Sequence, residues 1–422
     1  MLPPGPRRPA ALQVWAWISK PLPFLEDCAH RFGKRFTIKL GGGRKFVLTW
    51  DKDDVRTVFT GSPEVFSGKG NDSFRHFVGD HSLFVLDGDA HARHRRLVAP
   101  PFKGERMRTY ASLTNDLTRR AIERWPKGTP ISMVEAMNEI TIEVIFRAIF
   151  GVEDAQRVAS MWALVKKLGG TTTAALAFAP ALQRDLGSWS PWGRFLRTRA
   201  ALDELVFDEI KRARQATTAR EDILSSLARS ELTDQELRDE LLTLLGAGHE
   251  TTTAGLAWAL RWILGTPDAH ERVVADLKAG ETKILDAAIQ ESMRISPPIP
   301  IVPRRLATEA TLGPHTLPAG TYVAPCPYLS QRDPESFPDP DRFVLDRFVG
   351  KRPGPYEFYP FGGGTRLCIG LPFAIFEMRE VLATLFTHAR MTLVGEASRR
   401  AKRRAIILVP HDGTRVVVER TT

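Results

Sequence analysis

A cysteine at the end of a glycine-rich loop is the residue with the clearest capacity for chemistry. Cys368 closes the run Phe361-Gly-Gly-Gly-Thr-Arg-Leu-Cys and precedes a helical pattern over 371–386. The glycines permit a tight loop whose amides can point at one atom, and the start of a helix favours a thiolate over a thiol. Arg366 adds a guanidinium fork that suits a carboxylate. The loop therefore predicts a thiolate, against the alternative of a small buried hydrophobe.

Polar residues interrupt an otherwise apolar helical pattern over 236–264. Glycines and three successive threonines, Thr251 to Thr253, are poor choices for the middle of such a helix, and this conflict indicates a functional site. Glu250 beside Thr251 pairs an acid with an alcohol that can pass protons. Thr252 and Thr253 can equally bond back to the preceding turn. We expect His249 to pack or to face solvent.

Two further pairs of charged residues have the spacing of one helix face. Glu291 and Arg294 stand at i and i+3, and His91 and Arg95 stand at i and i+4. The second pair can reach one carboxylate together.

These segments resemble the signature motifs of the cytochrome P-450 superfamily. Residues 361–370 match its haem-binding pattern FxxGxRxCxG, residues 247–252 match its acid–alcohol motif, and residues 291–294 match its ExxR motif. The motifs occur in the expected order, and the resemblance covers about residues 30–420. It implies a haem-thiolate monooxygenase with haem b as cofactor and dioxygen as co-substrate.

The resemblance also implies roles for individual residues around the haem. Cys368 is the axial sulfur ligand, and a thiolate ligand favours O–O cleavage. Glu250 and Thr251 form the proton-delivering pair. The other implied haem contacts are His91, Arg95, Ala247, Gly248, Arg304, Phe361, Arg366 and Gly370, with Arg305 as the alternative to Arg304.

By the same resemblance, Glu291 and Arg294 belong to a buried network whose third member is Arg347. The segment Leu345-Asp346-Arg347 departs from the family pattern, because Leu345 replaces the common proline and Asp346 the common glutamate. Arg342 is therefore kept as an alternative third member.

Family topology indicates which segments line a substrate pocket, and all of them are apolar. An apolar substrate follows, whether terpenoid, fatty-acyl or steroid-like, although core packing explains the same composition equally well. The stretch 174–182 is one such segment. The individual residues expected to line the pocket are Phe77, Phe84, Leu244, Ile299, Ile301, Val302 and Ile406.

Composition narrows the class of protein. The 422 residues are 43% hydrophobic and 26% charged, as in a globular protein. Three cysteines argue against a disulfide framework, and no apolar run is long enough to span a bilayer. We expect a cytoplasmic monomer with one catalytic domain over 1–422, beginning with a proline-rich segment over 1–25.

The net charge of +10 allows acidic partners. The densest basic run, 399–404, lacks interleaved aromatic residues, so we interpret it as a solvated loop before a strand and expect no nucleic-acid binding. Electrons are expected from a separate ferredoxin or flavodoxin, with Arg93, Arg96, Lys351 and Arg352 as a basic docking patch. Alternative functions are a peroxygenase or hydroperoxide isomerase on the same scaffold, and a haem sensor without turnover.

The elements that must position these residues form a mainly α protein with a smaller β-rich part (α+β), in which a long oxygen-activating helix crosses a buried haem. Helical patterns dominate residues 105–295, for example 138–150 with Gly151 as its stop. Residues 35–50 predict a hairpin, and Asp51 an N-cap for a helix to Thr60. Short strands are predicted at 321–324, 405–409 and 414–419.

Overall fold

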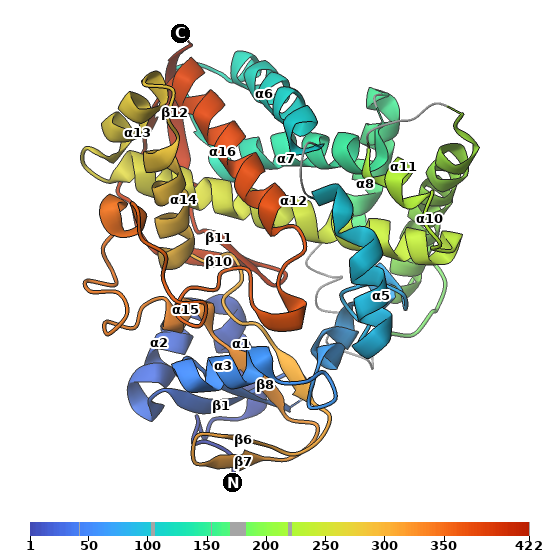
Figure 1. The fold of residues 1–422 in the computed structure, drawn as a ribbon, viewed down its shortest axis with the longest axis vertical. Helices are drawn as coiled ribbons and strands as arrows, with labels where there is room; N and C mark the ends of the chain where they lie inside the picture. The colour runs from blue at the N-terminus through green and yellow to red at the C-terminus, as the bar shows by residue number, and fades with distance from the viewer. Residues whose placement is uncertain (42, 103–105, 153, 169–182, 218–221, 422) are drawn as a thin grey trace.

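A computed structural model describes residues 1–41, 43–102, 106–152, 154–168, 183–217 and 222–421. Helices fill the upper part and a β-sheet the lower part, with the two termini at opposite ends (Figure 1). The mainly α architecture with a smaller β-rich part is confirmed. No helix within the described ranges is long and apolar enough to cross a membrane.

The lower sheet joins strands from both ends of the sequence. Its order is β1-β2-β8-β5-β3, with β1 (Arg35–Leu40), β2 (Arg44–Thr49), β3 (Phe66–Ser67), β5 (Arg304–Leu306) and β8 (Tyr322–Pro325). The predicted hairpin is present, since β1 pairs antiparallel with β2. The carboxylate of Asp51 accepts bonds from the amides of Asp53 and Asp54 and so caps α3 (Lys52–Thr60) as predicted.

Helices make up most of the remaining chain. Their bounds are α1 (Ala10–Ser19), α2 (Pro21–Phe32), α4 (Arg75–Val78), α5 (Gly88–Val98), α6 (Arg106–Arg124), α7 (Met133–Phe150), α8 (Ala155–Leu168), α10 (Pro191–Gln215), α11 (Ile223–Leu227), α12 (Asp234–Gly265), α13 (Ala269–Lys278), α14 (Lys283–Ile295), α15 (Pro327–Ser330) and α16 (Leu371–His388). The segment 1–25 therefore already contains α1 and the start of α2.

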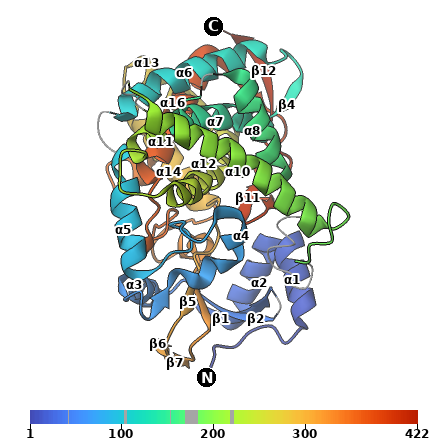
Figure 2. The same cartoon turned by 90° about the vertical axis from the view of Figure 1, so that its right-hand side faces the viewer.

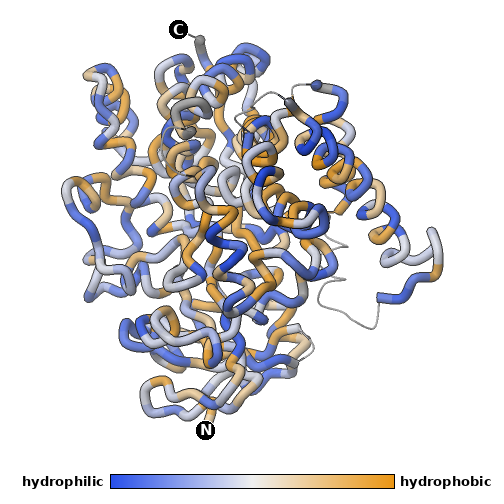
Figure 3. The backbone as a smooth tube through the Cα atoms, turned by 45° about the vertical axis from the view of Figure 1, so that its right-hand side comes forward, coloured by the Kyte–Doolittle hydropathy of each residue, from blue (hydrophilic) through white to orange (hydrophobic). Residues whose placement is uncertain are grey.

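Helix α12 is the central helix of the helical part, and several other helices contact it. A capping box between Thr233 and Glu236 starts it, and it continues unbroken through the predicted polar turn. Helices α7, α10, α14 and α16 pack on it, and Figure 2 shows α10 lying across its face. Apolar and polar segments alternate along the outer helices in Figure 3, as expected for helices that bury one face.

Short strands, most of them from the C-terminal part of the sequence, flank the upper helices. These are β4 (Pro130–Ser132), β9 (Ala389–Leu393), β10 (Ala401–Arg404), β11 (Ile407–Pro410) and β12 (Arg415–Thr421), while β6 (Ala310–Leu312) and β7 (His315–Leu317) form a separate hairpin. The single strand predicted over 405–409 is wrong in its first two residues, because the chain turns at Ala405, where φ is +48°. The predicted solvated loop over 399–404 is wrong in part, because 401–404 form β10.

Candidate active site

The cysteine loop is held by close backbone packing. The amide of Cys368 donates to the carbonyl of Phe361 at 3.0 Å, and Gly362 and Gly364 have φ of +71° and +66°. A Cβ on Gly364 would collide with the carbonyl oxygen of Phe59. Glycine is therefore required where the loop passes α3.

Cys368 stands directly before α16 as the sequence predicts. The amides of Gly370 and Leu371 donate to its sulfur, and the thiol is exposed on one side although protein surrounds it elsewhere. Burial nevertheless raises the pKa of this thiol, and the two amides and Arg95 offset only part of the increase. The amides therefore act in the predicted direction, but burial outweighs them; a bound metal cation would supply the remaining stabilisation of a thiolate.

Basic side chains gather near the cysteine from three separate segments. His91 and Arg95 come from α5, Arg304 from β5 and Arg366 from the cysteine loop. Burial, followed by Arg366 and Arg95, lowers the pKa of His91 to about 4. Burial, followed by Arg366, lowers the pKa of Arg304 to about 10. Asp87 opposes these effects at both residues, so positive charge exceeds negative charge in this cluster.

Protein groups already hold the guanidinium of Arg366. Its Nη2 donates to a carboxylate oxygen of Asp87 at 2.8 Å, and its Nη1 donates to the carbonyl of Leu83 at 3.0 Å. Arg304 is buried, whereas Arg305 is exposed. Arg304 is therefore the member of that pair that faces the cluster.

The cluster fits an anionic prosthetic group. Arg304 directs its Nη1 only to the carbonyl of its neighbour Pro303, and its Nη2 lies 3.5 Å from the carbonyl of Gly363. A buried guanidinium with such weak partners calls for an anion. Ala247, in the middle of α12, is exposed like Cys368, although most side chains along that helix are buried. Open space, a thiol and cations suit haem with its two propionates.

The polar turn of α12 is held by side-chain bonds. The hydroxyl of Thr251 donates to the carbonyl of Ala247 at 2.7 Å, and that of Thr252 donates to the carbonyl of Gly248 at 2.8 Å. Thr253 bonds Thr141 of α7 at 2.7 Å. The back-bonding expected for Thr252 is confirmed, while Thr253 has a partner on another helix.

His249 and Gly248 serve the packing of α12. The His249 ring lies against Trp162 with a centroid distance of 5.4 Å, and burial lowers the pKa of His249 to about 4. The packing role expected for this histidine is confirmed. A Cβ on Gly248 would lie 2.6 Å from Cδ1 of Ile145 in α7, so this glycine allows two helices to approach closely.

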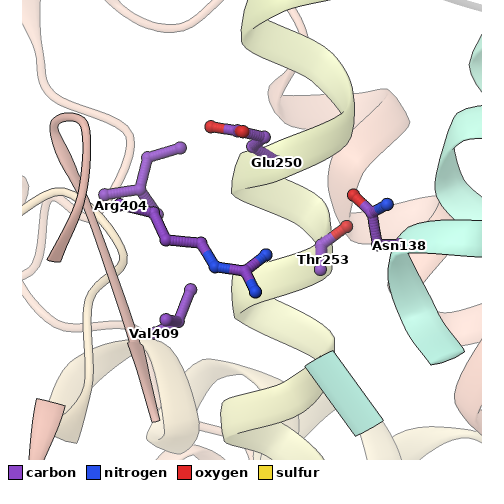
Figure 4. Close-up of a pocket in the computed structure, with 6 residues that line it drawn as sticks. Asn138, Glu250, Thr253, Arg404 and Val409 are labelled. Carbon is purple, nitrogen blue, oxygen red and sulfur yellow. The ribbon is translucent and has the colours of Figure 1, made fainter. Parts of the chain in front are cut away.

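Glu250 borders a small cavity on the side of α12 that faces β10 and α7 (Figure 4). The cavity has a volume of about 10 Å³, enough for about one water molecule. Asn138, Thr253 and Arg404 line it with Ile407 and Val409. Burial raises the pKa of Glu250, and Arg404 opposes the increase. Arg404 itself is paired with Glu135.

The charged network around α14 is buried and tightly bonded. Arg294 donates from Nε and Nη2 to the two carboxylate oxygens of Glu291 at 2.7 and 2.8 Å. Arg347 reaches Oε1 of Glu291 at 3.2 Å, whereas Arg342 is exposed and offers only its carbonyl to Arg294. The geometry therefore favours Arg347 over Arg342 as the third member.

The residues predicted to line a substrate pocket are distributed over several apolar clusters. Phe77 lies against α12, with its ring 3.0 Å from the position of a Cβ on Gly246, and Phe84 packs edge-on against Phe74. Leu244 is buried in the main core. Ile299 and Ile406 pack beside α12, Ile301 beside the N-terminal helices and Val302 beside the lower sheet. The stretch 174–182 lies outside the described residues.

Two residues of the site were missed by sequence reasoning. Asp87 pairs with Arg366, and no sequence motif assigned it a role of its own. Arg404, beside Glu250, was assigned to a solvated loop. Residues 401–404, Ala-Lys-Arg-Arg, show no alternation of apolar and polar side chains that would indicate a strand. No local signal could reveal contacts between residues more than 150 positions apart.

The helix-rich fold, the thiol loop and the cation cluster together define a haem-thiolate protein. Comparison with known proteins specifies the family, because the sequence model of Cytochrome P-450 matches residues 3–417. The chain belongs to the cytochrome P-450 family. It is accordingly a monooxygenase that binds haem b and uses dioxygen and electrons from a redox partner.

Several known proteins resemble the whole chain. It is 35% identical to the putative cytochrome P-450 135B1 of Mycobacterium tuberculosis, covering 100% of this chain and 92% of that protein. It is 35% identical to the putative cytochrome P-450 138 of the same organism, covering 99% and 96%. Among solved structures, CYP175A1 from Thermus thermophilus has a TM-score of 0.75 at 26% identity, covering 95% of each chain. Retinoic-acid-bound cyanobacterial CYP120A1 has a TM-score of 0.87 at 24% identity, covering 100% and 99%.

Proposed function

We propose that this monooxygenase inserts one oxygen atom into an apolar small molecule, with Cys368 as the iron ligand and Glu250 and Thr251 as the proton-delivering pair. The observation that carries the proposal is the arrangement at α12. The Thr251 hydroxyl lies near the exposed Ala247, and Glu250 borders a water-sized cavity on another side of the same turn. The haem, once bound, supplies the redox chemistry that activates dioxygen.

Glu250 and Thr251 would deliver protons to the site. Burial raises the pKa of Glu250 and so favours the protonated carboxyl group, and the hydroxyl of the adjacent Thr251 can pass a proton on. Cations around Arg304 and Arg95 would hold the propionates. The apolar residues beside α12, including Ile299 and Ile406, would hold the substrate and exclude bulk water.

Electrons would come from a separate acidic protein of the ferredoxin or flavodoxin type. Arg96, Lys351 and Arg352 are exposed and supply positive charge for docking. Arg93 contributes less than expected, because it pairs with Glu231 at 3.2 Å and Glu236 at 2.7 Å. We propose a monomer as the working form.

The test is the fraction of reducing equivalents recovered as oxygenated product, measured with a purified ferredoxin system and an apolar ligand that shifts the haem spectrum. Thr251→Ala should divert most equivalents to hydrogen peroxide. Thr252→Ala is the matched control, because Thr252 makes the same kind of back-bond but is buried, whereas Thr251 is partly exposed. This variant should retain the wild-type ratio. Equal ratios in both variants would contradict the role of Thr251, and efficient turnover with hydrogen peroxide alone would favour a peroxygenase.

A further inference from the structure

Helix α1 presents an apolar face to solvent. Leu12, Trp15 and Ile18 are 53%, 62% and 57% exposed, and their spacing of three residues places them along one side of the helix. We call these three side chains the α1 face. They are three of the eight large hydrophobic side chains that are exposed in the described ranges, and Figure 2 shows α1 at an outer edge of the molecule. A patch of exposed apolar side chains indicates an interaction site.

The protein holds α1 firmly in this orientation. Gln13, on the opposite side of the helix, is buried, and its Nε2 donates to the carbonyls of Pro6 and Arg8 at 3.1 and 2.7 Å. The Oε1 atom of Gln13 accepts a hydrogen bond from the amide of Lys39 in β1 at 2.9 Å. Trp17 is also buried and packs in the core between the N-terminal helices and the lower sheet. The α1 face is therefore fixed in place before any partner binds.

Basic side chains flank the α1 face. Strand β10 contacts α1, and the guanidinium carbon of Arg403 lies 4.1 Å from the centroid of the Trp17 ring. Residues 1–25 contain three basic residues and no acidic one, and residues 399–404 contain five basic residues and no acidic one. The exposed basic residues of these two segments are Arg7, Arg8, Lys20, Arg400 and Lys402. None of these five pairs with a carboxylate among the residues that the structure describes.

The acidic residues of the adjacent helix α2 are already engaged. Glu26 accepts a hydrogen bond from the hydroxyl of Tyr328 at 2.6 Å and lies 3.5 Å from a guanidinium nitrogen of Arg399. Asp27 pairs with Arg31 at 3.3 Å. Helix α2 therefore does not neutralise the basic side chains that flank the α1 face, and the surface around this face carries net positive charge.

An apolar face with flanking cations fits the surface of an anionic phospholipid bilayer. Tryptophan is enriched at the level of the lipid headgroups, because its ring is apolar and its N–H can donate a hydrogen bond. Lysine and arginine beside it are attracted to anionic headgroups. Helix α1 has ten residues and is about 15 Å long, half the thickness of the apolar core of a bilayer, so it would lie along the surface.

Two other kinds of partner match the α1 face less well. A nucleic acid would bind the cations but leave the apolar side chains without a partner. A second copy of this chain would cover the apolar side chains but bring two sets of cations together, and like charges across an interface are costly. A lipid surface engages both the apolar and the basic side chains.

We propose that the α1 face docks this protein on an anionic phospholipid surface. Trp15 and its two apolar neighbours enter the headgroup layer, and the flanking lysines and arginines contact lipid phosphates. The docking is peripheral and reversible. It goes beyond the proposed function and does not depend on it.

The test is co-sedimentation of the ferric holoprotein with vesicles of phosphatidylcholine and phosphatidylglycerol in equal parts, and with vesicles of phosphatidylcholine alone. The wild type should bind the anionic vesicles roughly tenfold or more tightly than the neutral ones, and added salt should weaken this binding. Trp15→Ser should lower the partition coefficient for anionic vesicles by roughly tenfold, because the largest inserted side chain is lost. Lys20→Gln combined with Lys402→Gln should lower it by roughly tenfold or more, because two cations are lost.

Matched controls come from exposed residues outside the α1 face and its flanking segments. Val394→Ser removes an exposed apolar side chain after β9, and Lys278→Gln combined with Lys283→Gln removes two exposed cations from α13 and α14. Figure 1 shows α13 in the upper part of the molecule and α1 in the lower part. Both controls should bind anionic vesicles as the wild type does. The carbon monoxide spectrum of every variant verifies that its haem site is folded.

Failure of the wild type to bind anionic vesicles would overturn the inference, as would undiminished binding by Trp15→Ser or an equal loss in the control variants. Equal binding to neutral vesicles would overturn the role of the flanking cations. Self-association of the wild type that Trp15→Ser abolishes, without any vesicle binding, would assign the α1 face to a second copy. Binding of duplex DNA through Lys20 and Lys402 without vesicle binding would likewise contradict the proposal.

Discussion

Glu250 lies beside Arg404 with a carboxyl group whose charge state depends on that neighbour. Burial raises its pKa above the ordinary value, and the positive charge of Arg404 holds it down. The carboxyl is protonated below its pKa, so removing Arg404 should raise the pKa further and move the titration midpoint to higher pH. Infrared difference spectra of the protonated carboxyl, recorded against pH for wild type and Arg404→Met, measure this shift. Glu250→Gln identifies the band by removing it, and an unchanged or lower midpoint in Arg404→Met would show that the two groups are uncoupled.

The negative charge of Glu291 balances the positive charges of two arginines in a buried site. The stability of the protein should therefore be sensitive to substitution of Glu291. Replacement by glutamine removes the negative charge that holds Arg294 and Arg347. Loss of one partner from a buried pair costs about 3–5 kcal/mol, so Glu291→Gln should unfold at markedly lower urea concentration. Arg342→Ala is the control, because that side chain is exposed and should change the free energy of unfolding by less than about 0.5 kcal/mol. Equal effects of the two substitutions would remove the argument for a buried network.

At the scale of elements, the contact between α7 and α12 sets where the polar turn lies. Gly248 leaves room for Ile145, and Thr253 bonds Thr141 one turn further along. Gly248→Val should therefore push the helices apart and lower the free energy of unfolding by about 1–3 kcal/mol. Adding Ile145→Ala should restore part of the loss if the clash is local. Additive effects of the two substitutions in a double-mutant cycle would place the strain elsewhere.

Elements differ in how well their sequences predicted them. Helix α12 and the hairpin of β1 and β2 were predicted because their signals are local: a 3.6-residue or a two-residue period with caps and glycine turns. The strand predicted over 405–409 overlaps most of β11, but β10 was missed, since it has only four residues and Arg403 and Arg404 suggested solvent. Pairing across the turn buries both arginines in part, and a single-sequence pattern carries no information on that pairing.

Over the whole molecule, the fold class and the cysteine loop could be predicted from sequence, whereas the electrostatics could not. The raised pKa of Cys368 and the lowered pKa of His91 come from burial among segments far apart in the chain. The same is true of Arg366, whose partner Asp87 lies about 280 residues away. Motifs indicated which residues take part, but the balance of charge among them is a property of the assembled protein.

The central claim is that Cys368 ligates the haem iron through its sulfur. The most direct measurement is the absorption spectrum of the reduced protein under carbon monoxide, for wild type, Cys368→Ala and the buried-cysteine control Cys326→Ala. A strongly red-shifted Soret band in wild type and in Cys326→Ala, absent from Cys368→Ala, is the predicted result. A histidine-like band in folded wild type, or an unaltered band in Cys368→Ala, would contradict the account.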